Sequence, residues 1–196
     1  IRDVERSRGL GDVYKRQVYS QSQGGNVNRI YLRSNEVKTI KPYADETTED
    51  LRFNWNTPVV FGHRGAMYIG AQYLYRSMDK GDSWERISPD LTTDDPAKQQ
   101  QEKSGGVTVD NTSAENHCTI ITISESPLNP EIIWVGTDDG NLQVTRDGGK
   151  TWINLTPKVP GLPPATWCSS VQASSYDAGM AYITFDGHRN GDMHPY

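Results

Sequence analysis

A short phrase that occurs twice limits the folds open to this chain more than any other feature of its 196 residues. Residues 77–84 and 145–152 both follow the pattern Ser/Thr-x-Asp-x-Gly-x-Ser/Thr-Trp, and the second copy starts 68 positions after the first (145 − 77). A repeat of this kind indicates a fold built from stacked copies of one structural unit.

The residues around the two phrases align as well. Residues 67–70 match residues 133–136, and residue 167 begins a third copy that runs to residue 185. Short runs of β-branched and aromatic residues, separated by Gly, Asp and Pro, predict four short strands in each complete copy. The strands expected are 18–20, 28–32 and 37–40, then 59–61, 67–69, 74–76 and 85–87, then 119–123, 132–135, 142–144 and 153–155.

Four-stranded antiparallel units in tandem are the blades of a β-propeller. We therefore predict an all-β fold, a β-propeller fragment with about two complete blades and two partial ones. The blades are expected at about residues 18–40, 55–88, 117–156 and 167–196. Because propellers typically have four to eight blades, the remaining blades of the same parent chain are expected as partners.

Composition argues against two classes of protein. The net charge of −5 disfavours a nucleic-acid partner, which requires a basic face. No apolar run approaches the roughly 20 residues of a membrane-spanning helix. Cys118 and Cys168 occupy matching positions on neighbouring blades, too far apart to bridge, so we predict free thiols. We expect no metal and no cofactor.

Two segments fall outside the repeating pattern. Residues 1–17 are basic and lack strand alternation, and residues 6–17 resemble a translated sequencing-adapter read. We take 1–17 as an artefactual or disordered leader and 18–196 as an incomplete propeller domain. Residues 89–116 form a long polar connection between blades, which predicts a mobile surface loop.

The repeated phrase suits a turn between the third and fourth strands of a blade. Its Asp can accept hydrogen bonds from nearby backbone N–H groups, its Gly permits a positive φ, and its Trp can pack between blades. A catalytic role for the two Asp residues is the alternative, but the turn explains the whole pattern. The residues assigned this structural role are Ser77, Asp79, Gly81, Trp84, Thr145, Asp147, Gly149 and Trp152.

Propeller geometry brings the starts of the inner strands and the loops between second and third strands to one face. The candidate ligand-binding residues there are Trp55, Asn56, His117, Asp138, Asp139, Trp167, Asp186, His188 and Arg189. Aromatic rings beside amides and carboxylates suit a sugar. Each candidate also has a structural explanation: the Trp rings can pack between blades, the Asp pair can stabilise a turn, and the His-Arg pair can join a structural network.

The repeated phrase resembles the Asp-box, or BNR, repeat of sialidases, sortilin-type receptors and xyloglucan-cleaving glycoside hydrolases. Over residues 18–196 the chain resembles bacterial propellers described as glycosyl hydrolase-like, BNR-repeat or sortilin-like. The segments that carry this resemblance are 53–58 (FNWNTP), 134–141 (WVGTDDGN) and 185–189 (FDGHR).

The resemblance also implies roles for residues. In the xyloglucan-cleaving relatives a catalytic Asp lies in a Thr-Asp-x-Gly loop, which residues 137–140 match, so it implies that Asp138 is catalytic. A glycosidase needs a second carboxylate, which in those relatives comes from a distant blade. The Asp-boxes of the family lie on the outer rim, away from ligands, and the clustered arginines of sialidases are not evident here.

Two hypotheses from different classes follow. The first is a fragment of a glycosyl hydrolase-like propeller that acts on or binds a polysaccharide or oligosaccharide. The alternative is a non-catalytic, sortilin-like propeller that binds peptide or protein ligands, or a structural propeller module. Both predict an exported protein of the periplasm, cell envelope or extracellular space.

Overall fold

The structure is a computed structural model that describes residues 11–12, 17–44, 50–100, 103, 116–188, 191–194 and 196. The strands in these residues form four antiparallel sheets, each joined to the next in chain order. No helix in this part of the chain is long and apolar enough to cross a membrane.

The first two sheets hold the strands before residue 90. The first sheet contains β1 (Gly11–Asp12), β2 (Gln17–Ser22), β3 (Asn26–Tyr31) and β4 (Glu36–Thr39). The second contains β5 (Val59–Phe61), β6 (Met67–Gly70), β7 (Leu74–Ser77) and β8 (Glu85–Arg86), with the short 3-10 helix η1 (His63–Gly65) between β5 and β6.

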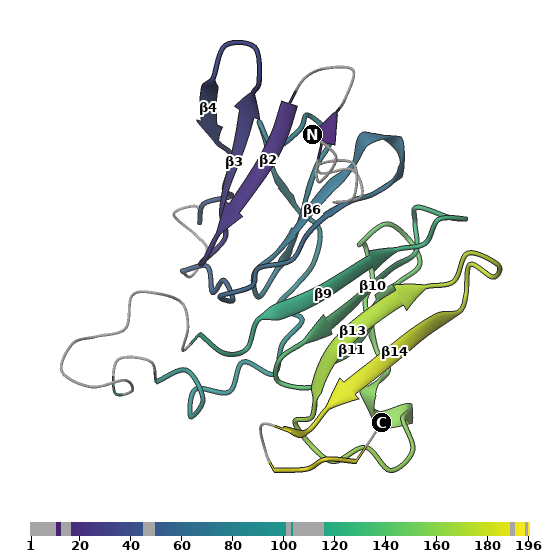
Figure 1. The fold of residues 1–196 in the computed structure, drawn as a ribbon. Coiled ribbons are helices and arrows are strands. Elements are labelled where there is room, and N and C mark those ends of the chain that lie inside the picture. The colour runs from purple at the N-terminus through teal and green to yellow at the C-terminus, as the bar shows by residue number, and fades with distance from the viewer. Residues whose placement is uncertain are drawn as a thin grey trace.

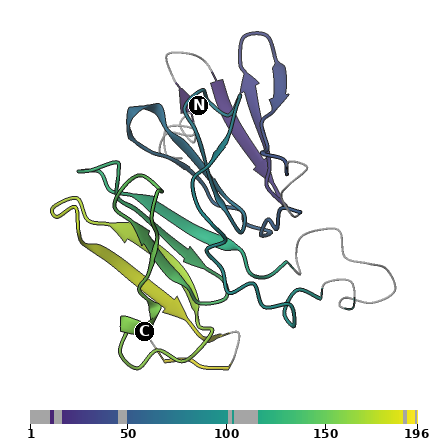
Figure 2. The ribbon, with the colours of Figure 1, turned by 180° about the vertical axis from the view of Figure 1, so that it is seen from behind.

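The third and fourth sheets follow. The third contains β9 (Ile120–Glu125), β10 (Ile133–Thr137), β11 (Leu142–Thr145) and β12 (Ile153–Asn154), and the 3-10 helix η3 (Thr156–Lys158) comes after it. The fourth pairs β13 (Trp167–Ala173) with β14 (Ala181–Asp186). Figures 1 and 2 show the sheets lying one after another from the purple N-terminal sheet to the yellow C-terminal pair.

This arrangement confirms the predicted fold class, an all-β propeller fragment made of four-stranded antiparallel blades. One strand was not expected: β1 lies inside the predicted leader and pairs with β2, Gly11 opposite Val18. Residues 1–10 and 13–16 lie outside the described residues, so the artefactual leader stays a prediction.

The strands β6 and β10 are buried along their whole length because each of their faces is covered by a different sheet. In β6, Met67 and Ile69 pack with Val27 of the first sheet, whereas Tyr68 packs with Ile133 of the third. Successive side chains of a strand point to opposite faces, so one strand serves two cores. The same alternation in β10 places Ile133 and Trp134 in successive cores.

Each copy of the repeated motif, residues 77–84 and 145–152, forms the hairpin between the third and fourth strands of its sheet. Asp79 Oδ1 accepts a 2.8 Å hydrogen bond from Ser83 N, and Asp147 Oδ1 accepts one of 2.9 Å from Thr151 N. Hydrogen bonds from the hydroxyl groups of Ser83 and Thr151, together with these backbone bonds, lower the pKa of each carboxyl to about 2. The motif is therefore a self-contained turn that favours an ionised Asp.

The hairpins also fasten each sheet to the one before it. Trp84 Nε1 donates to Ile40 O at 2.6 Å, and Trp152 Nε1 donates to Ile87 O at 3.0 Å. A Cβ on Gly149, whose φ is +103°, would lie 2.5 Å from the oxygen of Ile87. Glycine at this position is required both by the conformation and by the close approach of the neighbouring sheet.

Candidate functional site

The starts of the inner strands β5, β9 and β13 lie at the same end of the sheets as the β6–β7 and β10–β11 turns, because neighbouring strands are antiparallel. The repeated-motif hairpins lie at the opposite end. We call the end that holds the inner-strand starts the loop face. It is defined by residues 23–25, 52–57, 71–73, 90–94, 116–119, 138–141, 165–168 and 186–188.

Asp138 is the most enclosed candidate on the loop face. It has no exposed surface, and its carboxylate accepts hydrogen bonds from Thr119 N at 2.8 Å, Thr119 Oγ1 at 2.6 Å and Asn54 Nδ2 at 3.2 Å. His117 Nδ1 lies 4.0 Å from the same carboxylate. Burial raises the pKa of Asp138 above its usual value despite these donors. The residue thus ties the start of β9 to the segment that precedes β5.

Asp139 points to a different neighbour. Its Oδ2 accepts hydrogen bonds from Thr93 N at 2.6 Å and Thr93 Oγ1 at 2.8 Å, and its Oδ1 accepts one from Thr137 Oγ1. The side chain is buried. The adjacent carboxylates of the β10–β11 turn therefore hold different segments of the loop face: Asp138 binds Thr119 and Asn54, and Asp139 binds Thr93.

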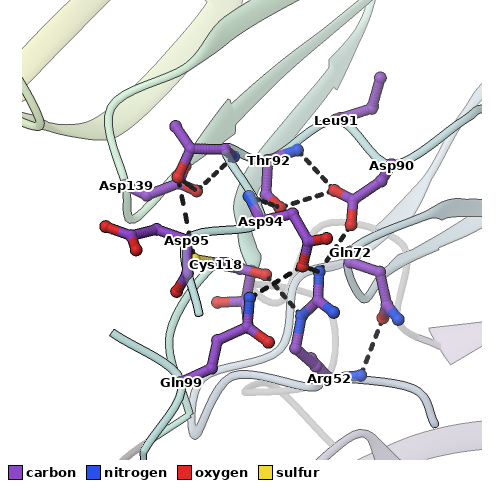
Figure 3. Close-up of polar contacts among 12 residues, drawn as sticks. Arg52, Gln72, Asp90, Leu91, Thr92, Asp94, Asp95, Gln99, Cys118 and Asp139 are labelled. Carbon is purple, nitrogen blue, oxygen red and sulfur yellow. Dashed lines mark hydrogen bonds and ion pairs between the residues drawn. The ribbon is translucent and has the colours of Figure 1, made fainter. Parts of the chain in front are cut away.

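A polar network around Arg52, which no motif in the sequence indicated, lies beside these carboxylates. Arg52 Nη2 contacts Asp90 Oδ2 at 2.6 Å and Asp94 Oδ1 at 3.1 Å, and Arg52 Nε donates to Cys118 O at 3.3 Å. Figure 3 shows Arg52 reaching these partners while its backbone N–H donates to Gln72. The guanidinium contacts two segments of the loop face, 90–94 and 116–119, and the backbone N–H of Arg52 contacts a third, 71–73.

The first part of the connection after β8 differs from the predicted mobile loop. Leu91 is buried in the core between the second and third sheets, and its carbonyl accepts hydrogen bonds from Asn141 Nδ2 and Gln143 Nε2. A signal was present in the sequence: Asp90 caps the turn by accepting from Thr92 N at 2.8 Å, as Asp commonly does. Residues 101–102 and 104–115 of this connection lie outside the described residues.

Four further candidates form two pairs on this side of the molecule. His117 and Trp167 contact each other edge to face, with ring centroids 6.1 Å apart. Asp186 and His188 form a local pair, in which His188 N donates to Asp186 Oδ1 at 3.0 Å. Arg189 lies outside the described residues, so its predicted role stays a prediction.

Trp55 and Asn56 line a groove of about 350 Å³ between the β2–β3 turn and the start of β5. Trp55 is 45% exposed, and the opposite wall holds Gln21, Ser22 and Gln23. Gln21 Nε2 donates to Thr57 O at 2.5 Å, which joins the two walls at one end. The groove therefore combines one open aromatic face with amide and hydroxyl groups.

The two cysteines are buried and free, as predicted. Cys118 has a φ of +59° and lies between the Arg52 network and Asp139, whereas Cys168 packs against Gly136. Burial raises the pKa of both thiols, that of Cys168 to about 12, which keeps them protonated at neutral pH. Within the described residues, no three His, Cys, Asp or Glu side chains are arranged to hold a metal ion.

No protein-family model matches this sequence, and no curated protein matches it either. Among solved structures, the chain is similar to an ancestral GH74 enzyme, with a TM-score of 0.51 and 16% identity over 89% of this chain and 21% of that one. It is also similar to the GH74 xyloglucanase from Xanthomonas campestris, with a TM-score of 0.49 and 20% identity over 86% of this chain and 24% of that one.

A third similar structure is YCF48 bound to D1 peptide, with a TM-score of 0.45 and 17% identity over 82% of this chain and 41% of that one. The chain spans about a fifth of the length of the ancestral GH74 enzyme. The likeness to that enzyme shows the fold, a β-propeller.

Proposed function

We propose that this chain is part of an exported Asp-box propeller that binds carbohydrate on its loop face. The observation that carries the proposal is the groove at Trp55, which a half-exposed indole lines together with Gln21 and Gln23. An aromatic face can cover the C–H side of a pyranose ring, while amides exchange hydrogen bonds with its hydroxyls. The identical contacts of the two repeated-motif hairpins support membership of the Asp-box proteins.

Trp55 should dominate this binding. Replacing it in Trp55→Ala removes the stacking surface, and an aromatic contact of about 1.4 kcal/mol corresponds to roughly tenfold weaker binding. Affinity electrophoresis against a panel of soluble polysaccharides, xyloglucan among them, measures the change. Tyr176→Ala is the matched control, because Tyr176 is a fully exposed aromatic residue away from the groove.

Two results would contradict the proposal. Equal retardation of the Trp55→Ala variant and the parent would remove the groove from the binding site. Absence of binding to every polysaccharide in the panel would favour the sortilin-like alternative, in which the same face takes a peptide.

Hydrolysis is the second candidate function, and one observation favours it: burial raises the pKa of Asp138, as a general acid requires. A substrate would have to displace Asn54 or His117 to reach this enclosed carboxylate, and a second carboxylate must act across the bond. Reducing-sugar release that is lost in Asp138→Asn, with the melting temperature unchanged, would support catalysis. Loss of sugar release together with a lower melting temperature would identify Asp138 as a structural residue.

A further inference from the structure

A second polar cluster lies at the end of the inner strands opposite to the loop face. Glu125, the last residue of β9, has a side chain only 2% exposed. Its Oε1 accepts a hydrogen bond from His63 N at 2.6 Å and lies 2.8 Å from His63 Nδ1. Its Oε2 accepts one from the Tyr68 hydroxyl at 2.6 Å. The cluster thus joins the second sheet to the third.

The surroundings of Glu125 are built around its carboxylate. A buried carboxylate is costly unless donors satisfy it, and here three donors converge on it. A Cβ on Gly62 would lie 2.3 Å from Glu125 Oε2, so glycine leaves room for the acid. Burial, together with the hydrogen bond to Glu125, raises the pKa of Tyr68, so the hydroxyl remains a donor.

The contact with Glu125 also sets the orientation of the His63 ring. An ionised carboxylate only accepts hydrogen bonds, so the Nδ1 atom carries the proton and donates it. In the neutral imidazole, Nε2 is then an acceptor. The His63 side chain is 52% exposed, and the Tyr68 hydroxyl and the His63 backbone N–H already join the two sheets. The imidazole is therefore a further polar group that solvent and small molecules can reach.

His63 lines a cavity of about 440 Å³ between the inner strands of the second, third and fourth sheets. One part of its wall is apolar, with Val60, Phe61 and Ile123. The fourth sheet contributes Gln172 and Ser175, both exposed. The cavity presents one oriented acceptor, an apolar surface, and an amide and a hydroxyl group across from it.

We propose that this cavity is a second ligand-binding site, which takes a neutral, ring-shaped ligand that carries hydroxyl groups. His63 Nε2 accepts a hydrogen bond from one hydroxyl, Gln172 and Ser175 bind others, and the apolar wall covers the C–H face of the ring. The site shares no residue with the groove at Trp55, so it goes beyond the proposed function and can fail independently of it.

The test is a titration of the full chain with methyl β-glucoside, followed by the ring-nitrogen NMR signals of its histidines. We expect a saturable shift of the His63 Nε2 signal. The signal of His194 should stay in place, because its side chain is 83% exposed, pairs with the nearby Asp192 and does not line the cavity. Saturation transfer to the proton signals of the glucoside measures binding in variants that lack this histidine. By this measure His63→Gln should weaken binding roughly tenfold, the value of one hydrogen bond of about 1.4 kcal/mol.

Two further variants keep the test decisive. Gln172→Leu changes an exposed residue on another strand, so it should weaken binding even if His63→Gln does not fold. Trp55→Ala should leave the His63 shift intact, which separates this site from the loop-face groove. Absence of a His63 shift in the parent protein, or glucoside binding that both cavity variants retain at full strength, would overturn the proposal. A shift produced by cyclohexanecarboxylate but not by the glucoside would overturn it in favour of an anion site.

Discussion

The repeated-motif hairpins make the same contacts in both copies, whereas the loop face holds its residues by contacts that differ from sheet to sheet. Trp84 and Trp152 donate to equivalent carbonyls of the preceding sheet, Ile40 and Ile87. On the loop face, the β6–β7 turn uses Gln72 to hold Arg52, but the β10–β11 turn uses two carboxylates. One end of the propeller maintains the stacking of the blades, and the other is free to vary.

Even the hairpins vary where the motif allows it. Its sixth position is Asp82 in the first copy, where it pairs with Arg29 at 2.9 Å and with Lys38 at 2.5 Å. In the second copy this position is Lys150, and Arg76 of the preceding sheet pairs instead with Glu85 of its own sheet. The fixed positions of the motif therefore maintain the backbone contacts, and the variable position carries the charge of each interface.

The largest expected change in stability comes from a substitution that tests whether the loop face also contributes to the core. Leu91→Ala empties a buried position between two sheets and should destabilise the protein by about 2–5 kcal/mol. Leu128→Ala, at a position 52% exposed, is the control and should change the free energy of unfolding by less than about 0.5 kcal/mol. Urea denaturation compares the two, and equal stabilities would mean that residues 89–100 do not contribute to the core.

A smaller loss of stability is expected from glycine substitutions that compare the two hairpins directly. In Gly149→Ala the new methyl group meets the backbone of Ile87, whereas in Gly81→Ala it meets the side chain of Ile40, which can move. Because strain at a positive φ costs about 1–3 kcal/mol, both variants should lose stability, and Gly149→Ala should lose more.

Gly161→Ala is the control for the comparison of the hairpins, since φ is +72° there and nothing lies within 4 Å. Thermal unfolding ranks the three variants. A Gly149→Ala protein as stable as Gly161→Ala would show that the hairpin is not pressed against the preceding sheet.

The smallest expected effect concerns how the free energy of unfolding changes at acidic pH. The pKa of Asp147 is lowered to about 2 in the folded protein, against about 3.9 in an unfolded chain, so its ionised form stabilises the fold above pH 4. That contribution is lost as the pH falls from 4 to 2. In Asp147→Asn the free energy of unfolding should therefore decrease less steeply over this range.

Glu36→Gln, a substitution at an exposed position in β4, is the control for the acid titration. Denaturant titrations at several pH values measure the slopes. Identical slopes for the parent and the Asp147→Asn variant would contradict the role given to this carboxylate.

Much of the fold could be predicted because its signals are local. The expected strand at 59–61 is β5 as observed, and that at 74–76 is β7, one residue longer. Leu91 could not be placed in the same way. It is a single apolar residue in a polar segment, and its burial depends on two sheets that meet only after the chain has folded.

The sequence predicted where the candidate residues lie in the fold better than it predicted what surrounds them. The sequence indicated that Asp138 and Trp55 belong to the same face. It did not indicate that Asp138 is enclosed by Asn54, 84 residues away, or that Trp55 stays half-exposed beside Gln21. An Asp-Gly turn looks alike in sequence whether or not another loop closes over it.

The sequence by itself determined the repeat, the four-stranded unit and the turn of the repeated motif, because each depends on residues a few positions apart. Only the tertiary structure decided which carboxylates are buried and which are open. Asp138 is enclosed by Thr119 at the start of its own sheet and by Asn54 next to the neighbouring one, and Glu125 by donors of the neighbouring sheet. Asp186, in contrast, pairs with His188 two residues away and stays partly exposed. Burial of a charge depends on contacts between segments far apart in the chain, and stacking of the blades brings those segments together.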